Sequence, residues 1–147
     1  MSGVGDAALA EARRWIGTPY LHQASARGAG ADCLGLLRGV WRALHGGEPE
    51  TAPPYTPDWS EASREERLFG AAQRHLLPKP LAAEASGDVL LFRMRAGTVA
   101  KHLGIAGNVG ATPTFVHAYS GHGVIESPLS APWRRRIVAR FEFPERG

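Results

Sequence analysis

Residues 31–45, Ala-Asp-Cys-Leu-Gly-Leu-Leu-Arg-Gly-Val-Trp-Arg-Ala-Leu-His, decide the fold of this chain. They predict a helix that begins at Asp32 or Cys33 and extends to about His45, because apolar side chains recur at helical spacing and form one stripe. The stripe consists of Leu34, Leu37, Trp41 and Leu44. A helix with such a stripe buries it against a core, so the rest of the chain must supply the packing surface.

Two glycines lie one helical turn apart inside this predicted helix. Gly35 and Gly39 each weaken a free helix by roughly 1 kcal/mol relative to alanine. Their presence is explained if another backbone packs closely against that face. Gly46 and Gly47 then end the helix. Before it, residues 23–31 are rich in Gly, Ala and Ser and predict a flexible loop.

The remaining elements are predicted as helices first and strands afterwards. One helix is capped by Asp6 and extends through Trp15; another is capped by Ser60 and extends to Leu76, before two prolines. Strands are predicted over residues 89–94, 102–107, 114–119, 124–126 and 137–143. This order predicts a single α+β domain over residues 1–147, with helices packed on one side of an antiparallel sheet of about five strands.

The composition is that of an ordinary globular domain of 147 residues, with 44% apolar and 21% charged residues. The net charge of +3 is too small to demand a nucleic-acid partner, and the basic run Arg134 to Arg136 is interpreted as a solvated loop or strand start. No apolar run is long enough to cross a bilayer. Residues 1–14 lack the features of a secretory signal, so we expect synthesis in the cytoplasm without export by that route.

Cys33 is the single cysteine of the chain, which excludes an internal disulfide and a cysteine-based zinc site. It lies at the first turn of the predicted helix, where unpaired amide groups and the helix dipole favour a negative charge. Such a position lowers a thiol pKa and makes the thiolate available as a nucleophile. The alternative is that Cys33 is a small buried apolar residue. Its position alone favours neither the nucleophile nor this alternative.

A cysteine nucleophile needs a base and an orienting group, and two strand histidines are candidates. His102 shares a strand face with Gly104 and Ala106, whose small size leaves room for a partner. His117 lies in the next strand. If the two strands pair across the turn at Asn108, one imidazole can fix the tautomer of the other. A partly exposed strand histidine is the alternative for His117.

Other chemistries find little support. Three histidines at 102, 117 and 122 could hold a catalytic zinc, but no His-Glu-x-x-His motif accompanies them. Phosphate-loop and Gly-x-Ser-x-Gly motifs are missing, and Gly3-Val4-Gly5 follows no strand. No cofactor is therefore expected. The remaining histidines receive no role: His22, His45, His75 and His122.

Five short blocks, taken in order, resemble the NlpC-type cell-wall cysteine peptidases, a compact branch of the papain-like enzymes. The blocks are Gly17-Thr18-Pro19-Tyr20, Asp32-Cys33-Leu34-Gly35-Leu36, Gly87-Asp88-Val89-Leu90-Leu91-Phe92, His102-Leu103-Gly104-Ile105 and Phe115-Val116-His117-Ala118. The resemblance covers nearly the whole chain and implies the papain-like fold. It also implies peptidoglycan stem peptides as substrate, often cut after a D-glutamyl residue.

The same resemblance implies a role for each matching residue. Cys33 is expected to be the nucleophile, His102 the general base and then acid, and His117 the third polar member. Tyr20 is expected beside the thiolate, shaping the oxyanion region, and Asp32 is expected to hold the free amine of the stem peptide. One departure concerns the substrate, since many members carry serine where this chain has leucine after the cysteine.

The chain resembles one branch in particular, the small peptidases encoded among phage-like tail genes, including those of gene transfer agents. Residues 41–59, with their Trp-Arg-Ala-Leu start, prolines and closing tryptophan, carry this resemblance. It implies a virion component with tail or baseplate partners that opens the cell wall locally for DNA delivery. Two alternatives stay open: a structural tail-tip plug or adaptor with a vestigial site, docked through Tyr55 and Trp59, and a related thiol amidase or acyltransferase.

Overall fold

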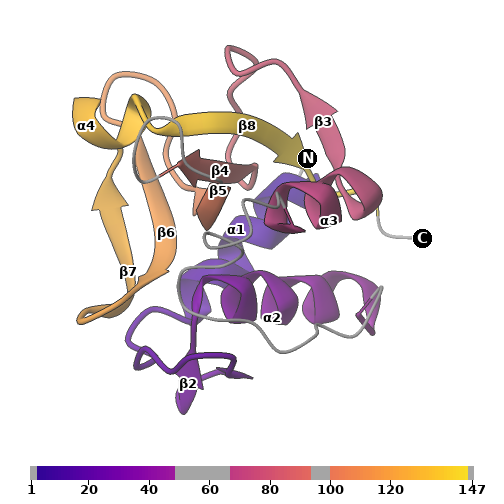
Figure 1. The fold of residues 1–147 in the computed structure, drawn as a ribbon. Coiled ribbons are helices and arrows are strands. Elements are labelled where there is room, and N and C mark those ends of the chain that lie inside the picture. Colours follow the sequence, from indigo (N-terminus) through magenta and orange to yellow (C-terminus); the bar gives the residue numbers. More distant parts are fainter. Residues whose placement is uncertain (1–2, 49–66, 94–99, 146–147) are drawn as a thin grey trace.

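The computed structural model describes residues 3–48, 67–93 and 100–145 (Figure 1). Within these residues the helices and strands are α1 Val4–Arg14, β1 Ser25–Ala26, β2 Gly30–Ala31, α2 Cys33–His45, α3 Arg67–His75, β3 Leu77–Lys79, β4 Val89–Arg93, β5 Ala100–Ala106, β6 Thr114–Tyr119, β7 Gly123–Pro128, α4 Ala131–Arg134 and β8 Ile137–Glu142. Helices precede most of the strands, as the sequence predicts. The proline-rich stretch with Tyr55 and Trp59, and the predicted cap Ser60, lie outside the described residues.

The main sheet of the described chain has the strand order β3-β8-β4-β5-β6-β7, and its neighbouring strands pair antiparallel. The α+β class and the antiparallel sheet are confirmed. The sheet gains a sixth strand, β3, which sequence reasoning missed because its centre is Pro78. Proline cannot donate a hydrogen bond to a neighbour, so it is tolerated at the sheet edge that β3 occupies.

Helix α2 begins and ends where the sequence predicts. Its N-cap is Asp32, whose carboxylate accepts a hydrogen bond from the backbone N–H of Gly35 at 2.7 Å. The helix ends at Gly46, where φ is 83°, a left-handed conformation that suits glycine. The deepest side of α2 differs from the predicted stripe: Leu36 and Val40 are fully buried, whereas the stripe residues other than Leu44 are only partly buried.

The glycine pair of α2 is explained by close neighbours. A Cβ at Gly35 would lie 1.8 Å from the carbonyl oxygen of Ala24, which is a backbone approach of the predicted kind. A Cβ at Gly39 would lie 2.0 Å from the ring of Trp15, so a side chain makes that contact. The glycines therefore let α2 lie against α1 and against the segment that precedes Cys33.

Three local predictions are wrong. Residues 23–31, predicted as a flexible loop, contain the small antiparallel sheet β1-β2. The first helix begins at Val4, and its N-cap is Gly3, three residues before the predicted cap Asp6. Helix α4 was not predicted; its four residues follow a serine and contain a proline in the first turn.

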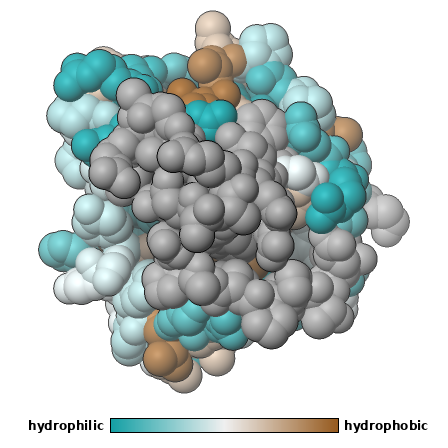
Figure 2. All heavy atoms as spheres, viewed as in Figure 1, coloured by the Kyte–Doolittle hydropathy of each residue, from teal (hydrophilic) through white to brown (hydrophobic). Residues whose placement is uncertain are grey.

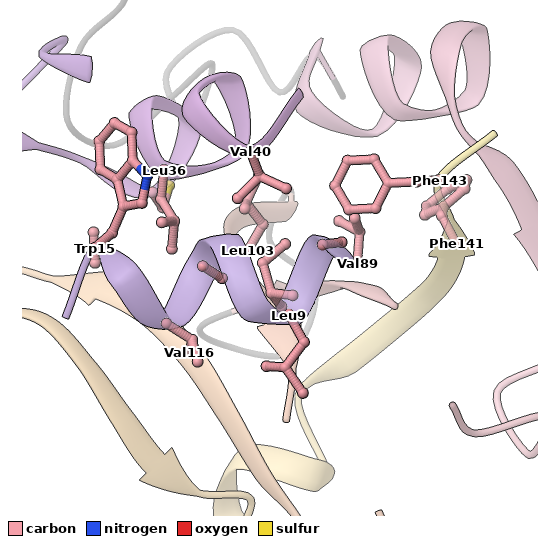
Figure 3. Packing of buried hydrophobic residues seen from close by; sticks show 14 of the residues in the cluster. Leu9, Trp15, Leu36, Val40, Val89, Leu103, Val116, Phe141 and Phe143 are labelled. Carbon is pink, nitrogen blue, oxygen red and sulfur yellow. The ribbon is translucent and has the colours of Figure 1, made fainter. Parts of the chain in front are cut away.

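The main core lies between the helices and one face of the sheet. Figure 3 shows Leu36 and Val40 of α2 and Leu9 of α1 packed toward Leu103 and Val116 of the sheet. Each fully buried aliphatic side chain contributes about 1.5–3 kcal/mol relative to exposure. This layer holds α2 against β5 and β6.

The opposite face of the sheet carries a smaller, more aromatic core. Leu90, Phe92, Ala106 and Phe115 project into it and are covered by α4 and its Trp133. Helices thus lie on both faces, and the prediction that they pack on one side holds only for the N-terminal helices. On the surface, hydrophilic side chains prevail among the described residues drawn in Figure 2. In the part of the chain that the structure describes, no helix is both long and apolar enough to cross a membrane.

Candidate active site

Cys33 is the first residue of α2 and is buried, with 6% of its surface exposed. The start of the helix is held by Asp32, whose second carboxylate oxygen accepts the backbone N–H of Gln23 at 2.7 Å. Gln23 has a positive φ of 65°, which is uncommon for a residue with a side chain. Two backbone amides therefore fix the Asp32 carboxylate, and with it the position of the cysteine.

Tyr20 lies near the cysteine. Its backbone forms a parallel bridge with Ala31, two residues before Cys33. Burial is the main reason that the pKa of the Tyr20 hydroxyl is raised to about 12, and the negative charges of Cys33 and Asp32 contribute to the same shift. The hydroxyl is therefore protonated at neutral pH and available to donate a hydrogen bond on the cysteine side of the fold.

The segment before Cys33 is tied to the end of the sheet where β6 stops and β7 starts. Ala31 N–H donates to the carbonyl of Pro19, and Val124 N–H donates to the carbonyl of Thr18. Gly123 stands directly beside Thr18, because a Cβ there would lie 2.6 Å from the Thr18 oxygen. In an antiparallel pair the end of β6 lies beside the beginning of β5. The start of α2 and the start of β5 are thus brought to the same end of the sheet.

His102, at the start of β5, contacts His117 of β6. Nε2 of His102 and Nδ1 of His117 are 2.8 Å apart, a hydrogen-bond distance whose donor depends on the tautomers. Both rings are buried, with exposed fractions of 7% and 0%. The structure therefore joins the two imidazoles that the sequence singled out, and it leaves Nδ1 of His102 outside this hydrogen bond.

Gly104 explains how the rings approach. A Cβ on Gly104 would lie 2.8 Å from the Phe115 ring and 3.3 Å from Cβ of His117. The small residue at position 104, next to His102 on the same strand face, is therefore required by the ring that packs across from it. This agrees with the prediction that small neighbours make room on that face.

A serine that sequence reasoning missed continues the pair. Nε2 of His117 lies 2.9 Å from the hydroxyl oxygen of Ser127 on β7. Ser127 pairs in register with Phe115, so its side chain shares the face of His117. A single sequence gives no signal for this contact, because it depends on the register between β6 and β7.

An aromatic layer surrounds the two histidines. The Trp133 ring lies 5.6 Å from that of His102 and 5.3 Å from that of His117, measured between ring centroids. Phe92 and Tyr119 also contact the His102 ring, at 5.7 and 5.9 Å. These rings exclude water from the imidazoles and hold their orientation.

Burial sets the charge state of both histidines. It is the main reason that the pKa of His102 is lowered to about 3, and the positive charge of His117 contributes to the same shift. Burial also lowers the pKa of His117 to about 4, with a smaller contribution from the charge of His122. Both rings are therefore neutral at pH 7 before any reaction, and a nearby thiolate would be the group that favours the cationic form of His102.

The other histidines occupy different surroundings. His122 stacks on Tyr119 at the β6–β7 turn, with ring centroids 5.4 Å apart. His22 lies 3.7 Å from a carboxylate oxygen of Asp32, and His45 packs on Trp41. No group of three or more metal-ligating side chains occurs within residues 3–48, 67–93 and 100–145. The zinc alternative with residues 102, 117 and 122 therefore gains no support from the geometry.

Comparison with known proteins shows which solved structures share this fold. No family model and no curated protein matches the sequence. Solved structures do match. The NlpC/p60 domain of the peptidoglycan hydrolase SagA has a TM-score of 0.65 at 22% identity, over 95% of this chain and 98% of that one. An NlpC/p60 family protein from Bacillus cereus has a TM-score of 0.64 at 14% identity, over 95% of this chain and 40% of that one. Ly7917 in complex with the hydrolysing product of MDP has a TM-score of 0.61 at 14% identity, over 95% and 62%.

The likeness establishes that this chain has the NlpC/p60 fold, the compact papain-like α+β fold that the sequence resemblance implies. The chain spans almost the whole SagA domain but less than two thirds of the other two proteins. At these identities the likeness concerns the fold and not the chemistry.

Proposed function

We propose that the chain is a cysteine peptidase that hydrolyses peptidoglycan stem peptides, with Cys33 as nucleophile, His102 as base and acid, and His117 as orienting group. The observation that carries the proposal is the buried 2.8 Å contact between Nε2 of His102 and Nδ1 of His117. A nucleophile's base needs a third group that fixes its ring, and this pair supplies both.

The proposed reaction is acyl transfer to water. The thiol proton moves from Sγ of Cys33 to Nδ1 of His102, and the thiolate attacks an amide carbonyl of the substrate. His102 then protonates the leaving amine, and a water molecule releases the acyl group from the sulfur. The proposal requires Nδ1 of His102 to face the sulfur across the end of the sheet where α2 and β5 begin.

The start of α2 supports this chemistry electrostatically. The first-turn amides of a helix favour an anion, and the Tyr20 hydroxyl is protonated and near the cysteine. Together they can stabilise the thiolate and then the oxyanion formed on the substrate. Burial disfavours protonation of His102. The proposed ion pair of a Cys33 thiolate and a His102 imidazolium therefore requires the negative charge of the thiolate next to the ring.

The role predicted for Asp32 toward the amine of a stem peptide stays a prediction. The carboxylate is 2% exposed, and each of its oxygens accepts a backbone N–H within the protein. One oxygen caps α2 through Gly35, and the other holds the segment at Gln23 and lies 3.7 Å from His22.

The substrate class is supported by the solved structures that share the fold. SagA is described as a peptidoglycan hydrolase, and Ly7917 was solved with a hydrolysis product of MDP. The sequence resemblance to peptidases encoded with phage-like tails supports a finer proposal, in which the protein is incorporated into a virion or gene transfer agent tail. There it would contact tail or baseplate proteins and open the cell wall locally.

The decisive experiment incubates the purified protein with peptidoglycan and analyses the soluble fragments by mass spectrometry. Wild-type protein is expected to release fragments cut at a stem-peptide bond, which also separates peptidase from amidase or acyltransferase activity. Cys33→Ala is expected to reduce the release to background, with Ser130→Ala as a folded control, since Ser130 is exposed and its side chain makes no capping hydrogen bond. Equal release by Cys33→Ala and wild type would refute the mechanism, and no release by either would favour the adaptor alternative.

A further inference from the structure

We propose that three consecutive arginines at the end of α4 form a docking surface for carboxylates of the cell wall, beside the candidate active site. This arginine surface consists of Arg134, the last residue of α4, and Arg135 and Arg136, which follow it. The identity of the polymer rests on the proposed function. The contacts concerned lie away from the bond that is cut, on parts of the same strand that are not hydrolysed.

The charge of the arginine surface is largely uncompensated. Arg134 and Arg135 are exposed, as the sequence predicts, and Arg136 is partly exposed. Arg134 pairs with Glu84 at 2.9 Å. Arg135 and Arg136 form no ion pair within residues 3–48, 67–93 and 100–145. Two positive charges therefore remain at one place, which is most of the chain's net charge of +3.

The fold holds Arg136 in a defined position. Its guanidinium lies over the Trp133 ring, 5.7 Å from the centroid, which is a cation–π contact. Its backbone carbonyl accepts the N–H of Arg93 at the end of β4, at 2.9 Å. Because α4 and β4 both restrain this residue, less conformational freedom is lost when an anion binds to it.

Trp133 connects the arginine surface to the candidate active site. The ring that carries Arg136 also contacts both imidazoles, with centroids 5.6 Å from His102 and 5.3 Å from His117. One side chain thus separates the arginines from the histidines. An anionic polymer that lies on the arginine surface is therefore brought next to the proposed reaction.

The chemistry of the surface fits carboxylates. A guanidinium presents planar donors that match the two oxygens of a carboxylate. Stem peptides of the cell wall carry such groups on their glutamyl residues and at their free ends, and one glycan strand carries many stem peptides. Charge complementarity thus favours the substrate polymer itself as the occupant. Several weak contacts along one strand would keep the enzyme on the wall between cleavage events.

The test measures binding of the full-length protein to purified peptidoglycan by cosedimentation, in a Cys33→Ala background that prevents hydrolysis. Arg135→Glu is expected to weaken binding by about 3- to 10-fold at low salt, because a repulsion replaces an attraction, and high salt should remove the difference. Arg14→Glu is the matched control: it changes the charge equally, at a side chain of α1 that is 68% exposed. It is expected to bind like the unaltered surface.

A second arm changes the polymer instead of the protein. Chemical amidation of the peptidoglycan carboxylates is expected to weaken binding by the unaltered surface as much as Arg135→Glu does, and to weaken the Arg135→Glu variant no further. This arm needs no substitution at the surface, so it stays decisive if a variant does not fold.

Either of two results would overturn the inference. One is that folded Arg135→Glu binds intact peptidoglycan as tightly as Arg14→Glu. The other is that amidation leaves binding by the unaltered surface unchanged. An acidic protein would then be the remaining candidate partner. The proposed function fails separately, if wild type hydrolyses no stem peptide, and Arg135-dependent binding would still support the docking surface in that case.

Discussion

The two faces of the main sheet bury different kinds of side chain. One face carries aliphatic side chains and is covered by α1 and α2, with Leu36 and Val40 fully buried. The other carries aromatic rings and two buried histidines under the half-buried Trp133. The first face stabilises the fold through apolar burial, whereas the second buries polar groups that must find hydrogen-bond partners. The difference teaches that one face is held together mainly by apolar burial, whereas the other also depends on hydrogen bonds that the strand register supplies.

The largest expected effect is on the face of the sheet that carries His102 and His117. His102→Gln is expected to lower the rate of stem-peptide hydrolysis by about 10²- to 10⁴-fold, the usual contribution of a general base and acid. Thiol alkylation of Cys33 at neutral pH should slow in parallel, because the variant lacks the proton acceptor. Rates are measured with a defined peptide and with a small haloacetamide. Unchanged alkylation and hydrolysis would show that His102 does not serve the thiol.

An intermediate effect is expected on the aliphatic face. Leu36→Ala should lower the free energy of unfolding by about 2–5 kcal/mol, since it leaves a cavity in a fully packed core. Urea denaturation followed by circular dichroism measures it. The matched control is Leu21→Ala, whose side chain is 56% exposed and whose loss should cost about 0.5 kcal/mol or less. Equal destabilisation by the two variants would contradict the assignment of this face to stability.

The third expected effect concerns pH and is the smallest of the three per residue. The folded-state pKa values of His102 and His117 lie near 3 and 4, below the ordinary 6.5. Between pH 6.5 and those values the unfolded chain binds more protons, so stability is fully present above pH 6.5 and falls as the pH decreases. Each histidine contributes a loss of up to about 1.4 kcal/mol per pH unit.

The measurement compares urea denaturation at pH 7 and pH 5, a range chosen above the titration of most carboxylates. His102→Gln removes one of the two titrating groups and should weaken the dependence on pH. A variant that keeps the full wild-type dependence would show that the buried histidines are not its source.

Much of the fold follows from local pattern. The bounds of α2, the strand Thr114–Tyr119 and the αL end at Gly46 agree with the sequence prediction. These elements have clear periodicity or a glycine stop, and the physical cause acts within a few residues. The wrong predictions lie where the physical cause is a contact with another segment. Pro78 enters an edge strand because β8 lies beside it, and Ser25–Ala26 and Gly30–Ala31 form short strands because they pair with each other.

The candidate site shows the same division. His102 and His117 could be singled out because each lies in a strand with small or alternating neighbours, and the structure brings them into contact. Ser127 and Trp133 could not, since neither residue type indicates a role by itself. Their contacts arise from strand register and from the return of the chain through α4.

By itself the sequence determined the helix that starts at Cys33, the strands that carry the histidines and the α+β order of the chain, because hydrophobic periodicity, caps and turns act locally. Only the tertiary structure decided which side chains meet across strands. Register set the contact of His117 with Ser127, packing of α4 buried the imidazoles, and burial set their charge. Such contacts join residues far apart in the chain, and their energies depend on the water that the finished fold excludes.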